Sequence, residues 1–140
     1  MEQIVRMNKW ANAHTNIPID LLRVAFGAFL FYKGLFFVNS SAFIAEIAQP
    51  FGLEGLSYFT IQIVPMFHIV GGLLIAIGLL TRLSAAIHLP LLGGALAVNL
   101  IGTIDASNLI QAGAALVLCL FFLAYGSGKH SVDYRLKMNQ

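Results

Sequence analysis

The chain has 140 residues, of which 59% are hydrophobic and 10% are charged, and its mean hydropathy is +0.83. An ordinary globular domain has roughly 45–50% apolar and about 25% charged residues, so this composition indicates a membrane protein. The net charge of +2 comes from basic residues spread along the chain, and this distribution does not predict a nucleic-acid partner.

Residues 1–17 are expected to form a short helix at the membrane surface. They lack the apolar core and the small-residue cleavage site of a secretory signal. Ile4, Met7, Trp10 and Ala11 fall on one helical face. Such a face suits a helix that lies in the headgroup region of the bilayer.

Four apolar segments follow, and each is long enough to cross a bilayer as a helix of about 20 residues. Stretches of 27, 22 and 23 residues contain no Asp, Glu, Lys or Arg; they run over residues 55–81, 83–104 and 106–128. We therefore predict an all-α integral membrane four-helix bundle over residues 18–126. The predicted spans cover about 20–38, 58–80, 83–101 and 108–125, with an outer connection at 39–57 and a C-terminal tail at 127–140.

The orientation of these spans is predicted from the basic residues, because short basic segments resist translocation. Basic residues precede or open the first span, lie between the second and third, and follow the fourth: Arg6, Lys9, Arg23, Arg82, Lys129, Arg135 and Lys137. The opposite loops contain Glu46, Glu54 and Asp105 and neither Lys nor Arg. Both termini are therefore expected to be cytoplasmic.

Small residues are expected to hold the helices together, because lipid provides no hydrophobic drive for helix association. The chain supplies them in every span: Gly27, Gly34, Gly71, Gly72, Gly78, Ala86, Gly93, Gly94 and Gly113. We expect these residues to lie where helices approach each other closely.

Polar side chains in the four spans form the first candidate site. Counting about 1.5 Å per residue from the cytoplasmic ends places one polar side chain of each span at a depth of about 18–24 Å. Ionisable residues inside a membrane usually face the bundle interior and mark a functional path. The predicted site contains Lys33, His68, Tyr32, Asn99 and Gln111. Alternatively, Lys33 extends to the headgroups and His68 donates to a backbone carbonyl.

A second polar cluster is predicted at the cytoplasmic end, where Arg23, Arg82 and Asp133 should all lie. Asp133 would bridge the two arginines if the C-terminal segment folds back under the bundle. Alternatively, the arginines bind lipid phosphates.

No intrinsic cofactor is expected from the residues alone. The same counting puts His88 about 10 Å closer to the cytoplasm than His68, so the two should not ligate one haem. No His, Cys or carboxylate spacing resembles a zinc site, and the single Cys119 can form neither an intrachain disulfide nor a dithiol pair.

Three segments resemble sequence landmarks of the DoxX-like family of small four-span bacterial membrane proteins. They are LLRVAFGAFLFYKGLFF, HIVGGLLIAIGLLTRLSAAIHLPLLGGALAVN and GSGKHSVDYRL, which together extend from about Asp20 to Leu136. The segments FYKGLFFVNS and IHLPLLGGALAVN are most similar to Bacteroidetes-type members.

The resemblance implies a multi-pass protein of the bacterial inner membrane that is associated with redox work. Relatives are subunits of a thiosulfate:quinone oxidoreductase, which makes a quinone the cofactor class that the resemblance implies. The family pattern has a His-Gly pair and then a lysine in the first helix, and an acidic residue before the glycines of the second. Here Lys33 takes the histidine position, Phe37 the lysine position and His68 the acidic position.

Three functions follow from these features. The first is a redox-linked, quinone-associated membrane subunit in which Lys33 and His68 bind carbonyl oxygens or relay a proton. The second is a non-catalytic structural or assembly subunit of a larger membrane complex, and the third is a lipid or small-solute binding protein. The chain has a mass of 15.2 kDa and no cofactor motif, which favours the first two over a complete oxidoreductase.

Overall fold

The computed structural model describes residues 16–40, 54–101 and 105–138. Within these ranges the chain is helical and contains no strand. In chain order the helices are α2 (Ile17–Asn39), α4 (Glu54–Ile77), α5 (Thr81–Ile101), α6 (Ala106–Tyr125) and α7 (Val132–Met138). The predicted surface helix at 1–17 and most of the predicted outer connection at 39–57 lie outside the described residues.

Helices α2, α5 and α6 are each long and apolar enough to cross a membrane. Helix α4 has 24 residues and contains the apolar stretch Ile61–Ile77. Large apolar side chains cover the outside of all four helices, as expected where lipid is the solvent. The prediction of an all-α membrane bundle is therefore confirmed.

The ends of the helices follow from local sequence signals. Helix α2 begins after Asn16, with Pro18 in its first turn, where a missing N–H leaves no hydrogen bond unmade. Helix α4 ends before Gly78, which has a φ of 75° that favours glycine. Asp105 caps α6 by accepting hydrogen bonds from the backbone N–H groups of Ser107 and Asn108.

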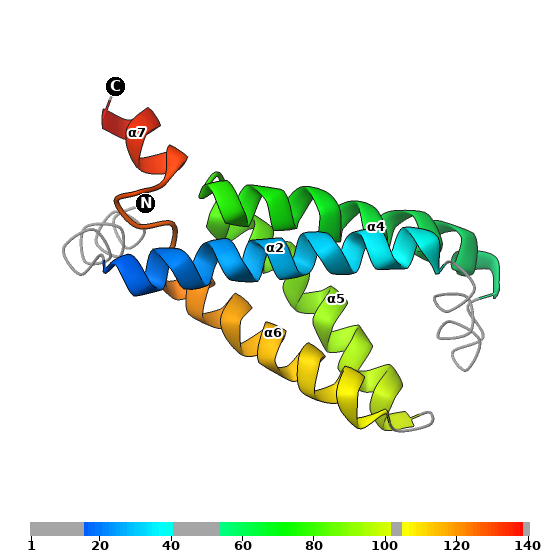
Figure 1. Ribbon diagram of the computed structural model, residues 1–140. Coiled ribbons are helices and arrows are strands. Elements are labelled where there is room, and N and C mark those ends of the chain that lie inside the picture. The colour runs from blue at the N-terminus through cyan, green and yellow to red at the C-terminus, as the bar shows by residue number, and fades with distance from the viewer. Residues whose placement is uncertain (1–15, 41–53, 102–104, 139–140) are drawn as a thin grey trace.

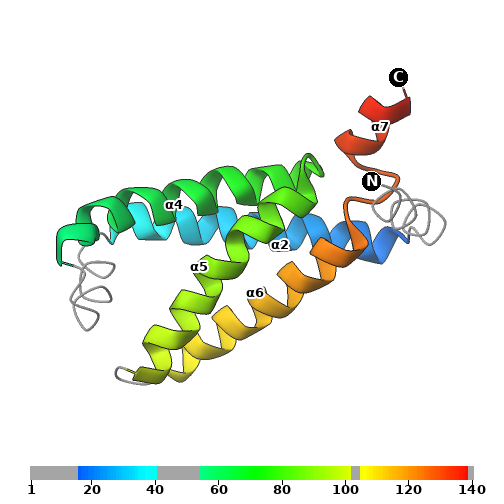
Figure 2. The ribbon, with the colours of Figure 1, turned by 180° about the vertical axis from the view of Figure 1, so that it is seen from behind.

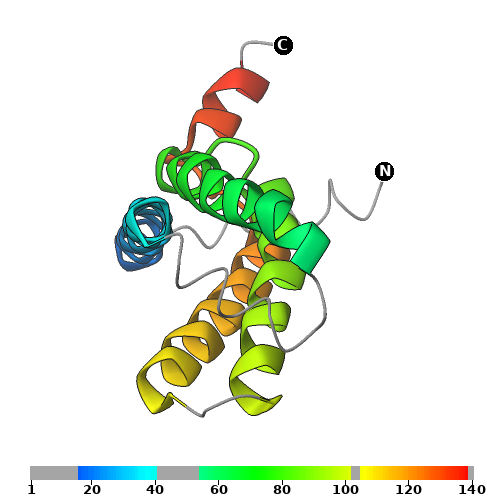
Figure 3. The ribbon, with the colours of Figure 1, turned by 90° about the vertical axis from the view of Figure 1, so that its right-hand side faces the viewer.

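The four long helices form two antiparallel pairs, α2 with α4 and α5 with α6 (Figure 1). The pairs come together at the end of the bundle that contains the α4–α5 turn. From there α5 and α6 diverge from the other pair, and this separation is also visible from behind (Figure 2) and from the side (Figure 3). The bundle is thus closed at one end and splayed at the other.

Glycines allow α2 and α4 to approach each other backbone to backbone. A Cβ atom added at Gly72 would lie 2.5 Å from the backbone nitrogen of Phe31 and 2.7 Å from the carbonyl oxygen of Gly27. A Cβ atom at Gly34 would lie 2.8 Å from the backbone nitrogen of Ile69. Real Cβ contacts do not reach these distances, so only glycine permits this pairing, as predicted.

The glycines of the second pair do not pack in this way, which differs from our expectation. No atom lies within 4 Å of a Cβ added at Gly93, Gly94 or Gly113. These three residues lie on α5 and α6, where the two pairs have separated. They face open space within the described part of the chain.

The hydrophobic core lies where the two pairs meet. Phe26 of α2 stacks on Phe122 of α6, with ring centroids 6.0 Å apart and an interplanar angle of 11°. Ile75 of α4, Ala85 of α5 and Cys119 of α6 are fully buried beside them. The core therefore joins all four helices and extends from the closed end to Leu30, Leu92 and Ala115 near the middle of the bundle.

We predict that Gly72→Leu destabilises the protein in detergent by about 1–3 kcal/mol or more, because the new side chain would overlap α2. Gly94→Leu adds the same side chain where there is open space and should leave the melting temperature within about 2 °C of the wild type. Equal melting temperatures for the two variants would contradict the α2–α4 packing.

Candidate functional site

Two buried histidines from neighbouring helices face each other inside the bundle. His68 comes from α4 and His88 from α5, and their ring centroids lie 5.1 Å apart at an interplanar angle of 73°. His88 is 0% exposed and His68 is also buried. Phe37 of α2 adds a third ring, edge-to-face with His68 at a centroid distance of 5.2 Å.

Each histidine is held by the helix from which it comes. Nδ1 of His68 lies 2.8 Å from the carbonyl oxygen of Val64, and Nδ1 of His88 lies 2.7 Å from that of Ser84. A carbonyl oxygen only accepts, so both Nδ1 atoms carry the proton. In the neutral rings both Nε2 atoms are therefore acceptors. Nε2 of His88 is buried and has no hydrogen-bond partner.

The close approach of the two rings depends on glycine. A Cβ atom at Gly71 would collide with Cε1 of His88, and one at Gly34 would lie 3.0 Å from Cβ of His68. Any larger residue at Gly71 would push α5 away from α4. Gly71, three residues after His68, thus makes space for the ring of His88.

The expected difference in depth between the two histidines is wrong. Helix α4 ends at Ile77 and α5 begins at Thr81, so the turn is earlier in the sequence than we predicted. Counting from these ends places His68 about 14 Å and His88 about 11 Å from the turn. The two side chains therefore lie at nearly the same depth. The sequence-based count failed because it placed the end of α4 three residues too late and the start of α5 two residues too late.

The two α2 residues of the predicted polar site, Tyr32 and Lys33, lie near the surface of the α2–α4 pair. Tyr32 is 65% exposed, and Lys33 is half-buried with its ammonium nitrogen 5.6 Å from the ring centroid of Phe36. In the described part of the chain, neither side chain forms a hydrogen bond with His68.

The structure places Asn99 and Gln111 at the splayed end, beside the connection between α5 and α6. Oδ1 of Asn99 accepts from the backbone N–H of Asp105 at 3.0 Å. Nε2 of Gln111 donates to Oγ of Ser107 at 2.9 Å. The amide of Asn99 thus links the end of α5 to the residue that caps α6, and the amide of Gln111 bonds within α6 itself.

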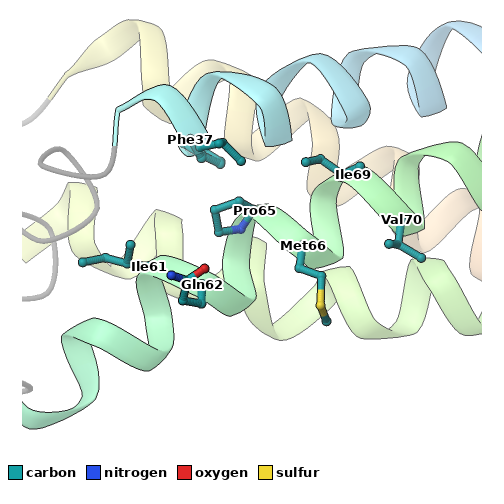
Figure 4. Close-up of a pocket in the computed structure, with 8 residues that line it drawn as sticks. Phe37, Ile61, Gln62, Pro65, Met66, Ile69 and Val70 are labelled. Atoms are coloured by element: carbon teal, nitrogen blue, oxygen red, sulfur yellow. The ribbon is translucent and has the colours of Figure 1, made fainter.

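A groove lies along α2 and α4 (Figure 4). Its volume is about 530 Å³. Its lining is apolar apart from one amide; the residues are Phe37, Val38, Ile61, Gln62, Pro65, Met66, Ile69 and Val70. Phe37 extends from α2 toward α4 and contacts both the groove and the ring of His68. It separates the groove from the histidine pair.

The three residues of the predicted cytoplasmic cluster, Arg23, Arg82 and Asp133, all lie at the closed end. Each forms a hydrogen bond with a backbone group. Nη1 of Arg23 donates to the carbonyl of Ser127, and Nη2 of Arg82 donates to that of Ala124 at 3.1 Å. Oδ1 of Asp133 accepts from the backbone N–H of Leu80 at 3.1 Å. The C-terminal segment does fold back, yet within the described residues Asp133 forms no ion pair with either arginine.

Sequence analysis missed His88 as a partner of His68. The signal that would have identified it is the spacing Thr81, Ser84, His88, which places three polar residues on one face of α5. All three are buried in the structure. In the described ranges no three His, Cys, Asp or Glu side chains come close enough to hold a metal ion.

A model of the DoxX family matches residues 19–100, which include all of α4, most of α2 and α5, and therefore both histidines. No curated protein and no solved structure matches the chain.

Proposed function

Because the chain belongs to the DoxX family of small multi-span membrane proteins, we propose that it is a redox-linked membrane subunit that binds a quinone-type molecule beside His68. The observation that supports this most strongly is the histidine pair: Nε2 of His88 is buried without a partner, and the ring of His68 lies against that of His88. Buried polar groups without partners are rare in folded proteins and often mark functional sites.

The reduced form of a quinone has the chemistry that these acceptors require. A quinol carries two hydroxyl groups, each of which can donate a hydrogen bond to a neutral Nε2 atom. When another redox subunit of the complex takes the two electrons of the quinol, this nitrogen can take one of its two protons and the other can leave to water. The oxidised quinone has only carbonyl acceptors and cannot make this bond, so His68 should distinguish the two redox states.

The groove gives such a molecule a place to lie. Its volume of about 530 Å³ is within the usual range of roughly 300–1,000 Å³ for small-molecule sites. Its wall is open toward lipid, because Met66 and Val70 are exposed, so an apolar tail would extend into the bilayer. A head group in the groove would contact Phe37, whose ring packs edge-to-face against that of His68.

Lys33 supplies the donor that the histidines lack. It lies four residues before Phe37 on α2, so the two side chains are on neighbouring parts of one helical face. Its ammonium group donates hydrogen bonds and would suit a quinone carbonyl. In this proposal Lys33 binds the oxidised form and His68 the reduced form.

We predict that His68→Leu weakens binding of a short-chain naphthoquinol by about 2- to 10-fold, the loss expected for one neutral hydrogen bond. Binding of the oxidised naphthoquinone should change less than about 2-fold. Equilibrium dialysis of the protein in nanodiscs measures both affinities under reducing and oxidising conditions.

Asn99→Leu is the matched control, because it replaces a membrane-embedded polar residue away from the groove. It should leave both affinities unchanged. An equal loss in the two variants, or unchanged quinol binding in His68→Leu, would contradict the proposed role of His68.

A second candidate function is that of an assembly subunit, and the splayed end favours it. Gly93, Gly94 and Gly113 face open space, and small residues on exposed membrane helices allow another helix to pack closely. Other membrane subunits would then fill the space beside α5 and α6. The Gly94→Leu protein would keep its quinol affinity and lose the membrane chains that co-purify with the wild type.

We further propose that the protein lies in the bacterial inner membrane with both termini in the cytoplasm. The closed end carries Arg23, Arg82 and the C-terminal segment, which agrees with the basic residues expected on the cytoplasmic side. In the Arg135→Cys protein, the new cysteine should not react with an impermeant thiol reagent added outside an intact inner membrane. Reaction there would indicate the opposite orientation.

A further inference from the structure

The cytoplasmic end of the bundle contains more hydrogen-bond donors than the described residues satisfy. Nε of Arg23, Nε and Nη1 of Arg82 and Oγ1 of Thr81 are all buried and have no partner. Arg23 is 3% exposed and Thr81 is 1% exposed. Burying charged donors without acceptors is unfavourable, so this cluster should attract an anion.

The donors belong to one small region. The two guanidinium groups bind carbonyls of Ala124 and Ser127, which are three residues apart in the chain. The guanidinium carbon of Arg23 lies 3.0 Å from the position of a Cβ at Gly78, in the turn that precedes Thr81. Arg23, Thr81 and Arg82 thus surround the α4–α5 turn.

Of the nearby carboxylates, Asp20 pairs with both His130 and Arg23, and Asp133 is bound to a backbone N–H. Asp20 lies 2.6 Å from Nδ1 of His130 and 3.7 Å from Nη1 of Arg23. Asp133 accepts from the backbone N–H of Leu80. In the part of the chain that the structure describes, no carboxylate comes within 4 Å of Arg82.

The backbone adds to the attraction for an anion. Thr81 and Arg82 are the first two residues of α5, a helix of 21 residues. The N-terminus of a helix carries a partial positive charge and free N–H groups, which together favour anions. The side chains of Arg23 and Arg82 bring two full positive charges to the same helix end.

We infer that Arg23, Thr81 and Arg82 form a binding site for a phosphate-type oxyanion. This site is independent of the proposed quinone site, which lies further into the membrane. Tetrahedral phosphate oxygens suit two guanidinium groups and a hydroxyl, because each oxygen accepts several hydrogen bonds.

A phospholipid headgroup and free inorganic phosphate share this chemistry. The exposed side chains beside Arg82 favour the lipid, because Leu80 and Leu83 would contact its acyl chains while its phosphate binds Arg82. Arg82 itself is only half-buried, so a ligand can approach from the lipid side.

The experiment uses the full chain, delipidated in a neutral detergent, and three probes. Phosphatidic acid and diacylglycerol with identical acyl chains differ only in the phosphate, and inorganic phosphate is compared with chloride at equal ionic strength. Native mass spectrometry measures lipid binding, and the melting temperature reports stabilisation by free phosphate.

We expect phosphatidic acid to bind the wild type at least about tenfold more tightly than diacylglycerol, because charge-assisted hydrogen bonds are involved. Arg82→Gln should abolish this preference. Arg135→Gln removes the same charge from an exposed position on the C-terminal helix and should preserve it. Stabilisation by inorganic phosphate without preference for phosphatidic acid would identify free phosphate as the ligand.

Arg82→Gln also removes a bond to the carbonyl of Ala124, so Thr81→Val provides a second test that keeps this contact. It removes only the unpartnered hydroxyl and should weaken phosphatidic acid binding by about 2- to 10-fold. The inference is overturned if neither phosphate probe exceeds its matched control, or if Arg135→Gln reduces binding as much as Arg82→Gln.

Discussion

The backbone approach of α2 to α4 over Gly27, Gly34 and Gly72 is the contact on which the rest of the structure depends. Lipid does not force helices together, so the two helices associate through van der Waals contact that only glycine permits. Once they are paired, the neighbouring Gly71 makes space for the ring of His88 from α5. One set of glycines therefore determines both the fold and the geometry of the histidine pair.

The closed and splayed ends of the bundle have different chemistry. At the closed end, the stacking of Phe26 on Phe122 and the hydrogen bond from Arg23 to the carbonyl of Ser127 join the two helix pairs, and Arg82 links α5 to α6. Further along, His68 and His88 lie where α4 and α5 still touch, and beyond them the pairs separate. The protein thus places two buried imidazole rings within the bundle, in contact with Phe37, which lines the groove. The arginines lie nearer the α4–α5 turn than the histidines do.

Much of the fold could be predicted from the sequence, because helix length and hydropathy are local properties. The polar site was harder, since it depends on which helix faces which. Asn99 and Gln111 share a depth with Lys33 in the count, yet Asn99 bonds to the backbone of Asp105 and Gln111 to Ser107 of its own helix. His88 was set aside because the turn at Gly78 comes three residues earlier than hydropathy indicates. A small error in a turn changes which residues meet across it.

The proton positions on the two histidines are the most direct test of this account. Nitrogen-15 solid-state NMR of the protein in lipid, with labelled histidine and with His68→Leu and His88→Leu proteins for assignment, measures which ring nitrogen carries hydrogen. We expect hydrogen on Nδ1 and a bare Nε2 for both residues at neutral pH, because Val64 and Ser84 accept from Nδ1. Hydrogen on Nε2 of either ring would contradict the account, since the pair would then lack the two acceptors on which the proposed function rests.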